Sequence, residues 1–558
     1  MAYIYYTTDK NRCQERNLML QYGGIMKKDF VKILSFSGLS LLFFMLALTV
    51  VLFFAGITIT PFNFLFANIA SLIFCTVIFK NFKQIFLSHI INFVIIYILG
   101  IFFFMTKDFS SDVILYHLPA MNLLKNGWNP VNIAAFELPM HDWAKYFAKG
   151  PWIICTCFAA FFKDFEISKL TNSFIIYLSF LFSYQALKNY IKDNKICCII
   201  LAFIMAFNPV SLMQSFTFLV DGFLSSCLII FILSISLYLK TKNNIYLYTF
   251  AFSLCLAVNS KLSAFAYIFI IGAGALYFAG KDLKYIKTFL ASIFISLFII
   301  GFNPYGINLI KHHNPFYPIG SNDIQIVEGF SPKTISDKFF ITKFVISQFA
   351  EANADKNEPV KIKIPFTITK KDINLAHCPQ LNLSGFGFLF SGVLVLSILF
   401  ILFSFKKAGY KKLLIAEGIL LLSVFVNPEC WWARFVPQFY LFPVILAVFL
   451  FMNADKKYKL MSYVLISAIF LNILITGYFY FKKVFEYQNI QNELTYILQR
   501  YDGDIYVNAD EMNIEGIRLK LKDYGIKFKE QKGNECLGKR FKYSTIPLCL
   551  IPKDGQKK

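Results

Sequence analysis

The chain has 558 residues, of which 57% are hydrophobic and 16% are charged, and its formal net charge is +22. This composition is too apolar for a soluble globular protein, and repeated apolar runs of roughly 17–25 residues match the length that crosses a bilayer. The Lys and Arg residues lie mostly in short segments between these runs, which fits the positive-inside rule better than a basic face for nucleic acid.

Residues 1–32 precede the first apolar run and form the expected cytoplasmic N-terminal segment. The part before Met26 is polar and has no pattern, so partial disorder is expected there, and Met26 is an equally suitable start of translation. No cleavable signal peptide is recognisable, because the first apolar run is long and begins only after Lys27, Lys28 and Lys32. These cations place the N-terminus in the cytoplasm.

The apolar runs predict an all-α polytopic membrane domain over residues 33–481, with about thirteen transmembrane helices. The predicted spans are residues 33–56, 60–79, 89–105, 173–187, 197–208, 219–239, 246–258, 262–278, 288–302, 385–405, 413–426, 437–452 and 460–481. Alternate crossings then leave every strongly basic short loop on the cytoplasmic face.

The opposite face receives two large loops, at residues 106–172 and 305–384, and the tail. Within the first loop, residues 150–162 are too short to cross comfortably and are expected to form an interfacial helix. The tail, residues 482–558, is charged and mixed, and predicts a small extracytoplasmic α/β domain. Helices are expected there at 489–500 and 514–524, and strands at 504–507 and near 526–529 and 543–551.

Most of the cysteines lie in apolar segments, where they are expected as small core residues. Cys536 and Cys549 are different, because they flank a short basic segment of the tail. They are able to form a disulfide if the tail lies outside the cytoplasm.

Two acids, Asp108 and Asp112, stand where the chain leaves the third predicted span. Hydrated surface acids are the common outcome in a loop, but the next segment, YHLPAMNLLKNGWNP, has the apolar spacing of a helix on the membrane surface. A carboxylate at the start of that helix can accept a proton from an incoming hydroxyl. Tyr116 and His117 follow, although a lone His at an interface is more often structural than catalytic.

Four cations on the same predicted face are candidates for binding a phosphate. Lys145 and Lys149 are four residues apart, so a helix would place them on one face, although interfacial lysines commonly extend only to water. Lys261, in NSKLSAF, stands in a short turn where extension to water is equally expected. Arg434, in WWARFVP, can bind a phosphate through two parallel hydrogen bonds. Asp221 begins a span on this face and is a partner for a neighbouring cation.

These motifs occur in an order that resembles the GT-C superfamily of membrane glycosyltransferases, in its bacterial protein-mannosyltransferase and aminoarabinose-transferase lineage. The resemblance covers residues 89–481 and rests on YHLP, NGWNP, NPVSLMQSFTFLVDG, NSKLSAF, NPYGINLIKHHNPFYP and WWARFVP. It implies an inverting transfer from a polyprenyl-phosphate sugar, with an acidic base in the first large loop. Asp112 is the matching position. Many relatives carry Glu directly after this Asp, whereas Val113 follows here, so Asp108 remains the alternative base.

The resemblance further implies an enzyme of the bacterial inner membrane, with an extracytoplasmic active site and a surface glycan, lipid or protein as acceptor. No cofactor beyond the lipid-linked donor is expected. Divalent metal is possible in the superfamily, but the first loop has no compact DxD cluster, so we expect no metal site. Two alternatives stay open: a glycan polymerase or ligase that uses a lipid-linked oligosaccharide, and a lipid-glycan flippase. Transporters usually carry ionisable groups at mid-membrane, whereas the charges here lie near span ends.

Overall fold

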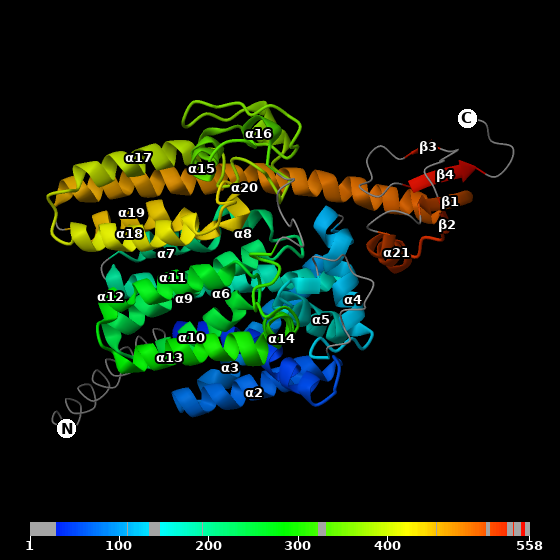
Figure 1. Cartoon of the computed structure of the whole chain (residues 1–558), viewed down its shortest axis with the longest axis horizontal. Coiled ribbons are helices and arrows are strands. Elements are labelled where there is room, and N and C mark those ends of the chain that lie inside the picture. The colour runs from blue at the N-terminus through cyan, green and yellow to red at the C-terminus, as the bar shows by residue number, and fades with distance from the viewer. Residues whose placement is uncertain are drawn as a thin grey trace, which may run out of the picture.

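The computed structural model describes residues 30–108, 110–132, 145–191, 194–321, 331–453, 455–508, 514–532, 539–540 and 548–552. Most of these residues are helical, and the long helices lie side by side along the longest axis of the molecule (Figure 1). Two further parts lie at one end of this bundle: the short helices of the first large loop and the C-terminal domain.

Seven helices in the described part of the chain are long and apolar enough to cross a membrane. They are Phe30–Phe54, α2 (Phe62–Phe79), α3 (Phe82–Phe104), η4 with α6 (Glu166–Lys169 and Leu170–Tyr190), α9 (Asp221–Thr241), α13 with η5 (Leu283–Phe294 and Ile295–Ile300) and α20 (Lys456–Gln499). A helical, membrane-embedded protein is therefore confirmed, while the number of thirteen spans stays a prediction. The helix after the first large loop begins at Glu166, seven residues before the predicted span.

The remaining helices are shorter. They are η1 (Val113–His117), α4 (Leu118–Lys125), α5 (Gly150–Phe162), α7 (Lys195–Ala206), α8 (Pro209–Met213), α10 (Ile245–Val258), α11 (Ala264–Gly274), α12 (Leu276–Ala279), η6 (Phe302–Gly306), α14 (Ile307–His312), η7 (Lys333–Ile335), α15 (Phe340–Phe349), α16 (Lys370–Asn374), α17 (Phe390–Phe403), α18 (Tyr410–Phe425), η8 (Ala433–Phe435), η9 (Pro437–Tyr440) and α19 (Leu441–Phe451).

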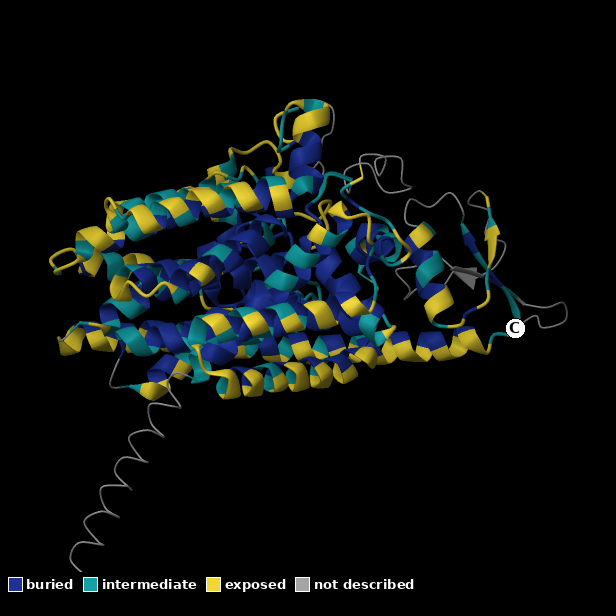
Figure 2. Cartoon of the chain, turned by 90° about the horizontal axis from the view of Figure 1, so that it is seen from below, coloured by how far each residue is buried: buried dark blue, intermediate teal, exposed yellow. Residues whose placement is uncertain are grey.

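The helices differ in how far the protein buries them. In the apolar 18-residue stretch of α9, 78% of the residues are buried inside the protein, whereas only 28% are buried in the corresponding stretches of α2 and α3. Large Phe, Ile and Leu side chains are exposed along the outer faces of α2 and α3, and Figure 2 shows exposed residues on outer helices around a buried interior. Such continuous apolar faces are unfavourable in water, so we assign them to contact with lipid.

The longest helix, α20, joins the membrane part to the C-terminal domain. Its 44 residues extend about 66 Å, roughly twice the hydrocarbon thickness of a bilayer. The helix runs through the domain boundary expected at residue 482, and the helix expected at 489–500 is its final part. No Gly or Pro occurs between residues 482 and 499 to break the helix. The helix therefore continues after residue 482, although its residues become more polar there.

The C-terminal domain contains a four-stranded sheet in the order β2-β1-β4-β3. Strand β1 (Gly503–Asn508) pairs in parallel with β2 (Lys529–Gln531) and antiparallel with β4 (Leu548–Pro552), and β3 (Lys539–Arg540) pairs antiparallel with β4. Helix α21 (Ile514–Asp523) lies between β1 and β2 in the chain. The predicted helices and strands occur in the predicted order, but β2 begins later than expected and β3 is an additional strand that the sequence did not predict. The disulfide prediction depends on Cys536, which lies outside the described residues.

The first large loop folds into short helices at one end of the bundle (Figure 1). Helix η1 continues directly into α4, where Leu118, Met121 and Leu124 are buried as their spacing predicts. Helix α5 has the predicted bounds, but its residues up to Ala160 are all buried in the protein. It therefore does not present one face to lipid and one to water, as an interfacial helix does.

Candidate active site

Asp112, Asp221, Lys261 and Arg434 meet at the end of the bundle that carries the first large loop. They belong to four segments: the residue before η1, the first residue of α9, the turn between α10 and α11, and η8. Arg434 Nη1 lies 3.2 Å from Asp112 Oδ2 and 3.8 Å from Asp221 Oδ2. Lys261 Nζ lies 2.6 Å from Asp221 Oδ1. We call these four residues the charge cluster.

Asp221 is the most buried member of the charge cluster, with 4% of its side chain exposed against 14% for Arg434, 18% for Asp112 and 22% for Lys261. Gln214 Nε2 donates to Asp221 Oδ2 at 3.0 Å, and the backbone N–H of Gly222 donates to Gln214 Oε1 at 2.8 Å. A buried carboxylate that faces two cations and an amide donor is well compensated. Asp221 thus holds both cations, while Asp112 stays partly accessible.

Aromatic rings flank the two cations of the charge cluster. Arg434 Cζ lies 4.2 Å from the ring centroid of Trp432, and Lys261 Nζ lies 3.8 Å from that of Phe435. Both distances are within the range of cation–π attraction. Burial disfavours the charge of Arg434, but the carboxylates of Asp112 and Asp221 outweigh it and raise the pKa of Arg434. Its guanidinium therefore remains charged in a partly dehydrated setting, where electrostatic interactions are stronger than in water.

Two buried donors of this region, Arg434 Nε and His117 Nε2, have no partner in the described part of the chain. Trp152 Nε1 donates to His117 Nδ1 at 2.7 Å. Burial lowers the pKa of His117 to about 4, so the ring is neutral near pH 7, and because Nδ1 accepts, the proton is on Nε2. Unused buried donors are rare, and an oxygen of a phosphate or a sugar would satisfy both.

Tyr116 is buried within the electrostatic reach of Asp112. Burial, followed by the negative charge of Asp112, raises the pKa of Tyr116 well above its ordinary value. The hydroxyl therefore stays protonated beside the carboxylate. Arg434 donates a hydrogen bond to the same carboxylate and holds it in position.

The prediction that a helix places Lys145 and Lys149 on one face is wrong. Residues 145 and 146 belong to a short 3-10 turn, Lys149 is the N-cap residue of α5, and α5 itself begins only at Gly150, so the two lysines do not share one helix. Lys149 is buried, its Nζ donates to the carbonyl oxygens of Lys145 at 2.7 Å and Phe147 at 2.6 Å, and it lies 5.3 Å from the ring centroid of Trp152. Burial lowers the pKa of Lys149 to about 7. These contacts tie its ammonium group to the loop backbone rather than to the charge cluster.

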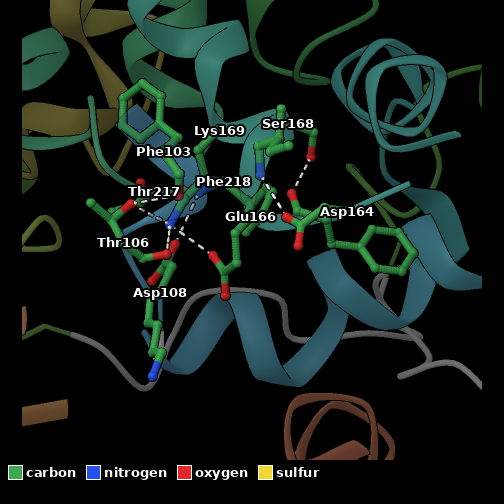
Figure 3. A network of polar contacts seen from close by, with 12 residues as sticks. Phe103, Thr106, Asp108, Asp164, Glu166, Ser168, Lys169, Thr217 and Phe218 are labelled. Carbon is green, nitrogen blue, oxygen red and sulfur yellow. Dashed lines mark hydrogen bonds and ion pairs between the residues drawn. The ribbon is translucent and has the colours of Figure 1, made fainter. Parts of the chain in front are cut away.

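Asp108 belongs to a different network, shown in Figure 3. Its Oδ1 accepts from the backbone N–H of Ser110 at 2.9 Å and its Oδ2 from that of Phe218 at 3.1 Å. Burial raises the pKa of Asp108, although Lys169 and Lys520 act in the opposite direction. Asp108 therefore fastens the start of the loop to the segment before α9. Of the two acids, Asp112 is therefore the one that contacts Arg434 of the charge cluster.

The residues that sequence reasoning left out are those that support the charge cluster. Gln214 lies in the NPVSLMQSFTFLVDG motif, seven residues before Asp221, and Trp152 lies in α5. The sequence does contain a signal for Gln214, because a polar amide within an otherwise apolar motif indicates a buried hydrogen bond. Nothing in the sequence pattern links Trp152 to His117, because their contact depends on how α5 packs.

Comparison of the chain with protein-family models, with curated proteins and with solved structures finds no match. The chemistry that bears on function is that of the charge cluster, with two cations, one buried carboxylate and one partly accessible carboxylate, together with the unused donors Arg434 Nε and His117 Nε2.

Proposed function

We propose that the protein is an inverting membrane glycosyltransferase that transfers a sugar from a polyprenyl-phosphate donor to an acceptor hydroxyl. The hydrogen bond between Arg434 and Asp112 carries the proposal, because it joins an acid of the first large loop to a cation 322 residues later. Asp221 and Lys261, from two further motifs of the GT-C resemblance, complete the same cluster. Each of these sequence motifs is weak evidence alone, but their charged side chains lie next to one another in the structure.

In the proposed reaction, the acceptor oxygen forms a bond to the anomeric carbon while the bond from that carbon to the phosphate oxygen breaks. The acceptor proton passes to the Asp112 carboxylate, and the electron pair leaves with the lipid phosphate. Attack from the side opposite the phosphate inverts the anomeric configuration. A base of this kind contributes about 10²–10⁴-fold to the rate.

The leaving lipid phosphate needs charge neutralisation rather than a general acid. Arg434 and Lys261 would supply this charge, and the free Arg434 Nε–H and His117 Nε2–H would add donors to phosphate or sugar oxygens. Because the protein already holds these groups in position, little reorganisation accompanies the reaction.

We assign the charge cluster to the extracytoplasmic face of a bacterial cytoplasmic membrane. Lys406 and Lys407 follow α17, and Lys456 and Lys457 begin α20, at the end of the bundle opposite the C-terminal domain (Figure 1). Basic residues mark the cytoplasmic side of membrane proteins. This distribution supports placing the charge cluster and the C-terminal domain outside.

The test is to supply membranes carrying the protein with a radiolabelled polyprenyl-phosphate sugar. Label is then counted in lipid, glycan and protein fractions, for the natural protein and for Asp112→Asn. The proposal requires transfer of a single sugar that depends on Asp112. Transfer of whole lipid-linked oligosaccharides would indicate a polymerase or ligase, and movement of an intact lipid-glycan across the membrane without transfer would indicate a flippase.

A further inference from the structure

The C-terminal domain contacts the segment that follows Asp112. Gly516 of α21 lies so close to Ile114 of η1 that the Ile114 carbonyl oxygen occupies the space a Cβ at position 516 would need. Ile114 is itself buried in a hydrophobic cluster whose other members, such as Ile517 and Leu521, all belong to the end of α20 and the C-terminal domain. The residue two positions after Asp112 is thus part of that domain's core.

Buried charges fasten the same helix to the membrane bundle. Lys520 of α21 pairs with Glu166 Oε1, and the Tyr524 hydroxyl donates to the same oxygen at 2.5 Å. Lys169, whose amine points toward Thr106 and Glu166 in Figure 3, lies 2.7 Å from Glu166 Oε2. All three charged side chains are buried, which is unfavourable unless the pairing is maintained. The docking of α21 is therefore a specific contact.

The start of the first large loop is held by α20 as well. The backbone N–H of Lys107 donates to Gln488 Oε1 at 2.7 Å, and Gln488 Nε2 donates back to the carbonyl oxygen of Lys107 at 2.5 Å. The Lys107 amine lies 4.7 Å from the ring centroid of Tyr524. Elements of the C-terminal part thus contact the chain on both sides of Asp112, at Lys107 and at Ile114.

We propose that the C-terminal domain positions the base of the active site: α21, through Gly516 and Lys520, holds η1 so that Asp112 faces Arg434. Helix η1 is a π-helical turn, a rare geometry that is frequently found at functional sites. Released from α21, η1 would relax and carry Asp112 away from the guanidinium. Gly516 and Lys520 are positioning residues in this scheme, and its catalytic consequence rests on the proposed glycosyltransferase function.

The decisive variant is Gly516→Ala, which places a methyl group where the Ile114 carbonyl oxygen lies. Arg518→Ala is the matched control, because Arg518 is on the same helix but pairs with Glu515 and Glu530, which are exposed. Full-length proteins in lipid nanodiscs are compared by steady-state kinetics and by amide hydrogen exchange of residues 113–117.

For Gly516→Ala we expect kcat to fall by about 10²-fold, with the KM for donor and for acceptor changed less than about threefold. Exchange of the η1 amides should rise by about tenfold, because their protection depends on α21. Arg518→Ala should match the natural protein in all these measurements. If Gly516→Ala does not fold, Tyr524→Phe, which removes one hydrogen bond to Glu166, should give the same pattern with about a threefold loss of kcat.

Unchanged exchange at 113–117 would overturn the docking, and faster exchange with unchanged kcat would overturn the positioning role. A raised acceptor KM with unchanged kcat would also overturn it, and would make the domain an acceptor-binding module. If the natural protein transfers no sugar from any polyprenyl-phosphate donor, the proposed function fails. The exchange measurement then still decides whether α21 holds η1.

Discussion

Arg434 donates a hydrogen bond of 3.2 Å to the carboxylate of Asp112, a residue from the opposite end of the membrane domain in sequence. A guanidinium has five N–H donors, and Arg434 Nε has no partner in the described part of the chain. One Arg can therefore hold the carboxylate and still offer donors to a phosphate. This geometry would let one guanidinium serve both the base and the leaving phosphate, on opposite sides of the same sugar.

Asp112→Asn keeps the shape of the side chain and removes the proton acceptor. We expect kcat for sugar transfer to fall by about 10²–10⁴-fold while the protein remains folded. Asp108→Asn is the contrasting variant, because Asp108 bonds to the backbone N–H groups of Ser110 and Phe218. It should mainly lower the midpoint of thermal unfolding. The reverse ranking in a labelled-sugar assay would assign the base to Asp108.

Lys261→Met removes one cation of the charge cluster and leaves Asp221 with Arg434. We expect the KM for the lipid-linked donor to rise by about tenfold or more, since a charged hydrogen bond to an anion contributes roughly 1.5–3 kcal/mol. Lys149→Met is the matched control, because the amine of Lys149 is bound to loop carbonyl oxygens. Its donor KM should change by less than about threefold. Equal effects of the two substitutions on donor binding would contradict this division of roles.

His117 gives the folded protein a sensitivity to acid. Its pKa is about 4 in the folded protein and 6.5 ordinarily, so between these pH values the unfolded chain binds a proton that the folded protein does not. Stability therefore falls as the pH drops through this window, by up to about 3 kcal/mol. His117→Gln should reduce the loss of thermal midpoint between pH 7 and pH 5. If His117→Gln lost as much thermal stability between pH 7 and pH 5 as the natural protein, His117 would not be the source of the acid sensitivity.

Glu166→Gln should destabilise the protein strongly. It leaves Lys169 and Lys520 buried without their shared carboxylate, and removing one partner of a buried pair costs about 3–5 kcal/mol. Glu515→Gln is the control, since its pair with Arg518 is exposed and worth at most about 1 kcal/mol. Chemical denaturation of both variants in detergent measures the difference. Similar midpoints would show that the Glu166 pairs do not stabilise the docked domain.

Much of the secondary structure could be predicted because it depends on local spacing. Apolar runs identified α3 and α9, and α5 has the predicted bounds. Composition failed at residue 482, because a helix can leave the membrane without a break. Spacing also failed at Lys145 and Lys149, because it predicted one face of a helix, whereas Lys145 belongs to a short turn and Lys149 caps the start of α5.

By itself, the sequence determined that this is an apolar helical protein whose acids and cations lie mostly near the ends of its spans, because hydrophobic periodicity and charge are properties of local segments. Glu417, buried in the middle of α18, is an exception. Only the tertiary structure decided which of these charges meet. Asp112 contacts Arg434 while Asp108 is bound by backbone N–H groups, and Lys261 joins Asp221 while Lys149 is tied to its own loop. These pairings depend on how η1, α9, η8 and the α10–α11 turn pack at one end of the bundle. Spacing along the chain does not specify that packing.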